Sequence, residues 1–182
     1  TMRDAVIVST ARTPIGKAYR GAFNATTPQA LAAHAIENAV KRAGLDGAEI
    51  SDCVIGSALQ QGHQAGNIAR QAAIRAGLPV TVAGMSLDRQ CASGMMAIAT
   101  AAKQVITDGM DIVIGGGVDS ISLVQTPEMR VSADPWLKQN KPEIYMTMLE
   151  TAENVAERYN VSREAQDEYA ARSQELTHQA QQ

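Results

Sequence analysis

Cys91 is the side chain of this sequence best placed for covalent chemistry. Residues 81–87 form an apolar run that predicts a buried strand, and residues 92–105 contain almost no helix breakers and predict a helix. A thiol at this junction faces unpaired backbone N–H groups and the positive end of the helix dipole. Both favour the thiolate, which is the nucleophilic form, so Cys91 is a candidate nucleophile.

The residues after Cys91 suit the same chemistry. Ser93 and Gly94 are small, so a substrate could reach the sulfur and the amides of the helix end, which would hold a developing oxyanion. The alternative is structural, because free cysteine is among the most buried residue types. Position alone does not choose between these interpretations. Cys53 lies inside a strand pattern, and we interpret it as structural.

Strands and helices alternate through the first two thirds of the chain. Short apolar runs predict buried strands at residues 5–9, 52–59, 81–87 and 111–118. Helical spacing, with Thr27 as N-cap and Pro28 behind it, predicts helices at residues 27–43, 67–77 and 92–105. Three glycines, residues 115–117, leave room for another backbone or a ligand. This order predicts an α/β layered fold with a central mixed sheet covered by helices.

The pattern changes after Asp119. Residues 120–142 contain three prolines and no sustained period, which predicts a long loop. Residues 148–159 and 163–179 predict helices, the second with Ser162 as N-cap. We therefore divide the chain into an α/β domain at residues 1–119, whose final elements are absent, and part of an α-rich inserted domain at residues 120–182.

Composition excludes several classes of protein. A net charge of −3 gives no electrostatic footprint for nucleic acid, and no apolar run is long enough for a membrane span. The N-terminus lacks the layout of a secretory signal, and two cysteines make no disulfide framework. The three histidines share no ligand spacing, so no metal site is predicted. We expect a cytoplasmic protein without nucleic-acid or membrane partners.

Six motifs are spread in order along nearly the whole chain. They are R-T-P-I-G (12–16), G-N-I-A-R-Q-A-A (66–73), S-L-D-R-Q-C-A-S-G (86–94), G-G-G-V-D-S (115–120), M-L-E-T-A-E-N-V-A-E-R-Y (148–159) and S-R-E-A-Q-D (162–167). Together they resemble the motifs of the thiolases, the family of acetyl-CoA acetyltransferases and 3-ketoacyl-CoA thiolases. In the motif at residues 115–120, Asp119 stands where the family has Glu.

The resemblance implies an acyl-CoA:acetyl-CoA C-acyltransferase. Cys91 matches the cysteine that carries the acyl group, with its backbone N–H as one oxyanion donor. Met148 matches a methionine that lines the acyl pocket, although its helical spacing also suits simple core packing. Coenzyme A is implied as a cosubstrate, with CoA thioesters as substrates and no permanently bound cofactor. Acyl chain length and the direction of the reaction remain open.

The resemblance also implies a second half, which lies beyond residue 182. It would supply the histidine that deprotonates Cys91, a second cysteine and an asparagine, and His34, His63 and His178 match none of these. We therefore expect the 182-residue chain alone to be inactive. The resemblance implies a homodimer or homotetramer, with dimers formed across the sheet edge beside the cysteine.

Two other functions were weighed against thiolase activity. A ketoacyl-synthase-type condensing enzyme shares the fold and a cysteine at this position, but the sequence around Cys91 favours a thiolase. A catalytically silent assembly or lipid-binding module would account for the incomplete active site. An intact setting around Cys91 argues against that module.

Overall fold

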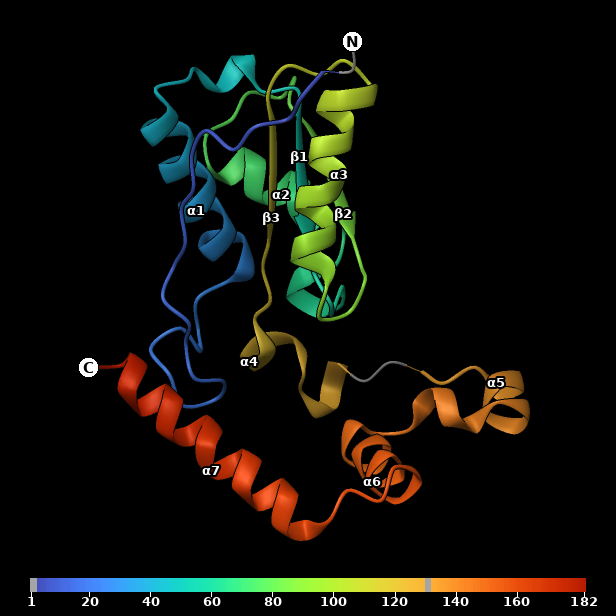
Figure 1. Cartoon of the computed structure of the whole chain (residues 1–182). Coiled ribbons are helices and arrows are strands. Elements are labelled where there is room, and N and C mark those ends of the chain that lie inside the picture. The colour runs from blue at the N-terminus through green and yellow to red at the C-terminus, as the bar shows by residue number, and fades with distance from the viewer. Residues whose placement is uncertain (1–2, 130–131) are drawn as a thin grey trace. The chain divides into compact units, whose positions relative to one another are not determined.

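The computed structural model describes residues 3–129 and 132–182 (Figure 1). The chain forms two compact units, residues 1–130 and 131–182, which are treated separately below. The predicted α/β layered class is confirmed by a central sheet with helices on both faces. Every pairing between the described strands is parallel, whereas a mixed sheet was predicted. The predicted domain boundary after residue 119 remains a prediction, because the compact units divide the chain at a later point.

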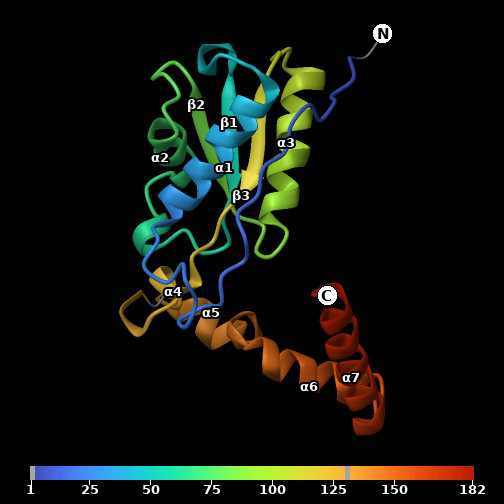
Figure 2. The same cartoon turned by 90° about the vertical axis from the view of Figure 1, so that its left-hand side faces the viewer.

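The sheet of the first unit is built from three parallel strands (Figure 2). Its central strand β1, Asp52–Gly56, is buried along its whole length. It pairs with β2, Ala83–Leu87, on one side and with β3, Val113–Gly117, on the other. A central strand that is buried along its whole length is typical of a parallel sheet covered on both faces.

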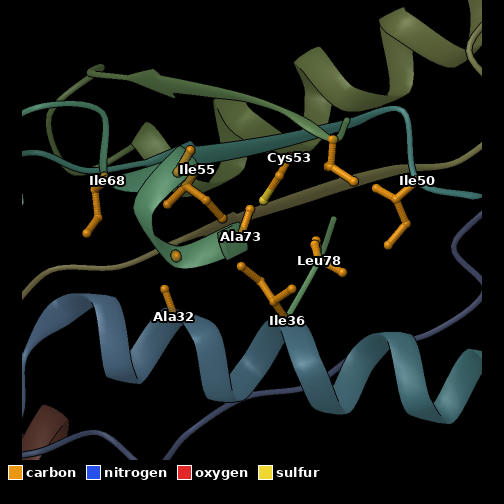
Figure 3. Close-up of a cluster of buried hydrophobic side chains, with 11 residues drawn as sticks. Ala32, Ile36, Ile50, Cys53, Ile55, Ile68, Ala73 and Leu78 are labelled. Atoms are coloured by element: carbon orange, nitrogen blue, oxygen red, sulfur yellow. The ribbon is translucent and has the colours of Figure 1, made fainter. Parts of the chain in front are cut away.

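Helices cover both faces of this sheet. Cys53 and Ile55 of β1 share one buried cluster with residues of α1, Pro28–Ala43, and α2, Ile68–Arg75 (Figure 3). Val54 packs on the opposite face against α3, Ser93–Thr107. Successive strand side chains point to opposite faces, so β1 alone contributes to both halves of the core.

The helix ends follow the signals in the sequence. The Thr27 side chain accepts a hydrogen bond from the Ala30 N–H, Pro28 takes the first helical position, and Gly44 ends α1 at a φ of 68°. A 3₁₀ turn, η1 at Gly47–Glu49, leads into β1, and another, η2 at Gly62–Gln64, precedes α2. The helices predicted between the strands are confirmed.

Glycines let α3 lie directly on the sheet. The run at residues 115–117 predicted the approach of either another backbone or a ligand, and here the backbone of α3 approaches. A Cβ on Gly115 would lie 2.9 Å from the Ile98 Cα, and one on Gly117 would lie 3.0 Å from the Gly94 Cα. A Cβ on Gly56 would come within 2.2 Å of the Ser93 carbonyl group. Any larger residue at these positions would push the start of α3 away from the strands.

The prediction of a strand at residues 5–9 is wrong. This segment is an unpaired coil, and its apolar residues Val6, Ile7 and Val8 are 76%, 77% and 72% exposed. Its ends are attached to the unit: Arg3 pairs with Asp111, and the Ser9 hydroxyl donates to the Ala39 carbonyl. The apolar pattern was correct, but a strand also needs a neighbour, and no described residue pairs with this segment.

Residues 120–142 are not the long structureless loop that was predicted. The described part of this segment forms α4, Ile121–Val124, and η3, Pro127–Met129, in the first unit. The second unit contains α5, Pro135–Asn140, η4, Pro142–Tyr145, α6, Met148–Arg158, and α7, Arg163–Ala180. Three of these short elements begin with proline, so residues that break long helices here start short ones.

None of the described residues of the second unit, 132–182, is buried. The two long helices begin as predicted, α6 at a capping box of Thr147 and Glu150 and α7 at Ser162. None of the described residues in these helices is buried. Large apolar side chains such as Leu149 and Tyr169 are exposed. Burial of apolar faces supplies most helical stability, so this unit depends on a surface outside itself.

Candidate active site

The loops that follow the three strands all begin at the same edge of the sheet, because the strands are parallel. Cys91 follows β2, Ser57 follows β1 and Asp119 follows β3. The chain leaves β1 toward α2 on one face and leaves β2 toward α3 on the other. Such a reversal at the carboxyl end of parallel strands is where α/β folds place their ligand sites.

Cys91 is exposed in a short, tightly bonded loop between β2 and α3. The Asp88 carboxylate accepts a hydrogen bond of 2.7 Å from the Gln90 N–H. Gln90 has a φ of 47°, a left-handed conformation that costs a residue other than glycine about 1–2 kcal/mol. The loop therefore holds Cys91 in a defined place, at the cost of backbone strain at Gln90.

Helix α3 differs from the other long helices at its start. Its N-cap is Ala92, and no side chain caps its first amides. Every other described helix of eight residues or more has a capping side chain, from Thr27, Asn67, Thr147 and Ser162. The amides of Gly94 and Met95 are used in none of the described hydrogen bonds. The helix end beside Cys91 is therefore open to an anionic group.

The backbone N–H of Cys91 also makes none of the hydrogen bonds found among the described residues. It lies directly before the uncapped start of α3. This arrangement is compatible with the oxyanion role predicted for this N–H, which remains a prediction.

A polar network joins the loops after β1 and β3. The Asp119 carboxylate accepts hydrogen bonds from the Ser57 hydroxyl at 3.1 Å, the Ala58 N–H at 3.2 Å and the Gln64 side-chain amide at 2.9 Å. Gln64 is buried, and its carbonyl oxygen accepts from the Ser120 N–H. No sequence pattern marked Ser57 or Gln64, and only the unusual Asp119 in its motif was a signal for this network.

The two cysteines have opposite environments. Cys53 is completely buried in the core, as its interpretation as structural required, whereas Cys91 is exposed. Burial, and secondarily the nearby Asp52 carboxylate, raises the pKa of the Cys53 thiol to about 12. Cys53 therefore stays a neutral thiol in the folded protein and is chemically inert.

The Cys53 thiol should make stability depend on pH in alkaline solution. Its pKa rises from 9.0 in the unfolded chain to about 12 on folding, so only the unfolded state loses this proton between those values. The unfolding free energy should then fall by up to about 1.4 kcal/mol per pH unit above pH 9. Urea unfolding should show a flatter pH dependence in Cys53→Ala than in the unmodified protein. Cys91→Ala, which removes the exposed thiol, serves as the control for loss of a cysteine outside the core.

The other predicted site residue, Met148, lies at the start of α6 in the second unit. Its side chain is 76% exposed, so it does not fill a core within that unit. Its role in an acyl pocket remains a prediction. Within residues 3–129 and 132–182, no three His, Cys, Asp or Glu side chains are grouped so that they could hold a metal ion.

Comparisons with known proteins identify the family to which this chain belongs. The family described as "Thiolase, N-terminal domain" matches residues 5–182, and the chain belongs to this family. It is 43% identical over 174 residues to the 3-ketoacyl-CoA thiolase of Bacillus subtilis, covering 94% of this chain and 44% of that protein. It is 35% identical over 194 residues to the acetyl-CoA acetyltransferase of Cupriavidus necator, covering 99% and 48%.

A solved structure agrees with the sequence matches. The crystal structure of the Bacillus anthracis acetyl-CoA acetyltransferase superimposes with a TM-score of 0.80 at 37% identity, over 98% of this chain and 48% of that one. The chain thus spans about half the length of the relatives it matches. The predicted resemblance to the thiolases is confirmed. No helix among the described residues is both long and apolar enough to cross a membrane.

Proposed function

We propose that this chain is the nucleophile-bearing part of an acyl-CoA:acetyl-CoA C-acyltransferase, a thiolase, and that Cys91 is its acyl carrier. The observation that carries the proposal is the exposed Cys91 thiol in a strained loop before the uncapped start of α3. The names of its relatives, 3-ketoacyl-CoA thiolase and acetyl-CoA acetyltransferase, support CoA thioesters as substrates. They also favour a thiolase over a ketoacyl synthase.

Thiolysis on Cys91 takes two steps. The thiolate attacks the 3-keto carbon of a 3-ketoacyl-CoA, the bond between C2 and C3 breaks, and acetyl-CoA leaves after its carbanion takes up a proton. Free CoA then attacks the thioester on Cys91, and the acyl group leaves as acyl-CoA while the thiolate is restored. Two easier steps replace one difficult one. The N–H of Cys91 and the open amides of α3 would stabilise the oxyanion formed in each step.

The complete activity requires a further part that corresponds to the rest of the relatives. The outer edge of β3 is unpaired among the described residues, and the apolar segment 5–9 lies exposed without a strand partner. Residues 7–10 and Arg42 also line an open hollow of about 510 Å³. These surfaces suit additional elements of the same fold that would pair with the strand edge and cover the segment.

A homodimer fits the other edge of the sheet. The outer edge of β2 is unpaired among the described strands. The apolar side chain of Val80, just before β2, is exposed. An unpaired edge with an exposed apolar residue before it favours association with a second copy, as the resemblance implies. Whether two such dimers form a tetramer stays open.

Acetyl transfer to Cys91 tests the proposed function directly. The 182-residue chain is incubated with acetyl-CoA, and the acetylated peptide is identified by mass spectrometry. We expect slow acetylation of Cys91, at least about tenfold faster than that of Cys53, because Cys91 is exposed whereas Cys53 is buried and stays a neutral thiol. In Cys91→Ser the acetyl thioester at this position should disappear.

The same experiment separates the thiolase from a silent module. Acetylation of Cys91 at no more than the rate of a free cysteine in a denatured chain would contradict the proposed nucleophile. Cys53→Ala is the matched control, because it removes the buried thiol and should leave acetylation of Cys91 unchanged.

A further inference from the structure

The Ser93 side chain connects the two sides of the Cys91 loop. Its Oγ accepts a hydrogen bond of 2.9 Å from the Arg89 N–H and donates one of 2.6 Å to the Gln90 carbonyl. Arg89 and Gln90 precede the cysteine and Ser93 follows it, so these bonds close a ring around Cys91. Ser93 is 3% exposed, and its hydroxyl is therefore shielded from water.

Helix capping does not explain this hydroxyl. A serine at a helix start usually accepts a hydrogen bond from an amide of the first turn. Ser93 is the first residue of α3, yet α3 has no side-chain cap. The hydroxyl points back to the loop instead, and it leaves the amides beside Cys91 free.

The ring is anchored on the sheet. The backbone of Ser93 lies so close to β1 that a Cβ on Gly56 would be 2.2 Å from the Ser93 carbonyl carbon and oxygen. Contact with β1 thus fixes the backbone of Ser93, and the hydrogen bonds of Ser93 fix the loop and the strained Gln90. Without these two bonds, the left-handed Gln90 would relax and carry Cys91 with it.

We propose that Ser93 is a positioning residue that holds the Cys91 sulfur and N–H in the alignment required for acyl transfer. This inference rests on the proposed function of Cys91. Acetyl transfer needs the thiolate and the oxyanion donors in alignment, whereas alkylation by iodoacetamide needs an accessible thiolate but no oxyanion donor. Loss of the hydroxyl should therefore slow acetylation much more than alkylation.

Single-turnover acetylation and alkylation of Cys91 are compared in the full 182-residue chain and in Ser93→Ala. We expect Ser93→Ala to lower the acetylation rate by at least about tenfold, since small misplacements of reacting groups have effects of this size. Alkylation should change by less than about threefold. Equal acetylation rates in folded Ser93→Ala and in the unmodified chain would overturn the proposal. A fall in the acetylation rate that only matches the fraction of unfolded Ser93→Ala protein would also overturn it.

Ser86→Ala is the matched control. The Ser86 hydroxyl also makes two hydrogen bonds, accepting from the Ala69 N–H and donating to the Asn67 side chain, but neither reaches the Cys91 loop. Its removal should leave the ratio of acetylation to alkylation unchanged. An equal fall of this ratio in Ser86→Ala would overturn the specific role of Ser93.

Amide hydrogen exchange in the unmodified chain decides the question even where Ser93→Ala does not fold. The Arg89 amide should exchange at least about tenfold more slowly than in an unstructured peptide, because Ser93 Oγ accepts its hydrogen. Exchange at the rate of an unstructured peptide would overturn the positioning role of Ser93. Lack of acetylation in the unmodified chain would instead contradict the proposed function, and the exchange of the Arg89 amide would still test the hydrogen bond to Ser93.

Discussion

Gly56→Ala is expected to destabilise the first unit by about 3 kcal/mol or more, a large part of the stability of an ordinary domain. The added Cβ would lie 2.2 Å from the carbonyl group of Ser93 and 2.6 Å from the Gly94 nitrogen. All of these are backbone atoms, so no side chain can turn away. The start of α3 would have to move from the sheet, and the Cys91 loop with it. Urea unfolding measures the loss of stability.

Gly116→Ala provides the matched control on the neighbouring strand. A Cβ at this position would meet only the Ile55 Cδ1, at 3.7 Å, which is ordinary contact. Because glycine in a strand costs about 0.5–1 kcal/mol relative to alanine, this variant should be neutral or slightly more stable. Similar unfolding midpoints for the two variants would contradict the close packing of α3 on Gly56.

Local signals in the sequence predicted most of the fold. The pattern at residues 52–59 indicated a strand, and its residues Asp52–Gly56 form the buried centre of the sheet. Thr27 and Pro28 marked the start of α1, and the glycines of β3 marked the close approach of α3. The place of Cys91 before a helix start also followed from the sequence, because strand, cysteine and helix are adjacent in it.

Features that depend on distant contacts were not predictable in this way. An apolar run such as residues 5–9 shows a preference for burial but does not supply a neighbouring strand, and here the segment is exposed. Asp119 and Gln64 are 55 residues apart, so nothing in either local pattern connects them. Ser93 was interpreted only as a small residue beside the sulfur, whereas its buried hydroxyl bonds the loop before Cys91.

The second large effect concerns turnover rather than stability. The 182-residue chain should cleave acetoacetyl-CoA about 10²–10⁴-fold more slowly than a chimera that continues into the C-terminal part of the Bacillus subtilis relative. This chain and the Bacillus subtilis relative are 43% identical over the 174 residues that match, so the two sequences can be joined at the end of that region. Among the described residues, no side chain makes a hydrogen bond to the Cys91 sulfur, so this part of the chain holds no base against it.

Thiolysis is followed by the absorbance of acetoacetyl-CoA, with Cys91→Ser made in both proteins. The substitution should abolish the activity of the chimera, because the acyl group then has no thiolate to receive it. A chimera that remains active with Cys91→Ser would show that the C-terminal part works without this nucleophile. Turnover by the 182-residue chain at the rate of the chimera would show instead that a base within residues 1–182 reaches Cys91. Acetylation of Cys91 together with turnover slowed about 10²–10⁴-fold is the expected behaviour of a nucleophile that lacks its proton acceptor.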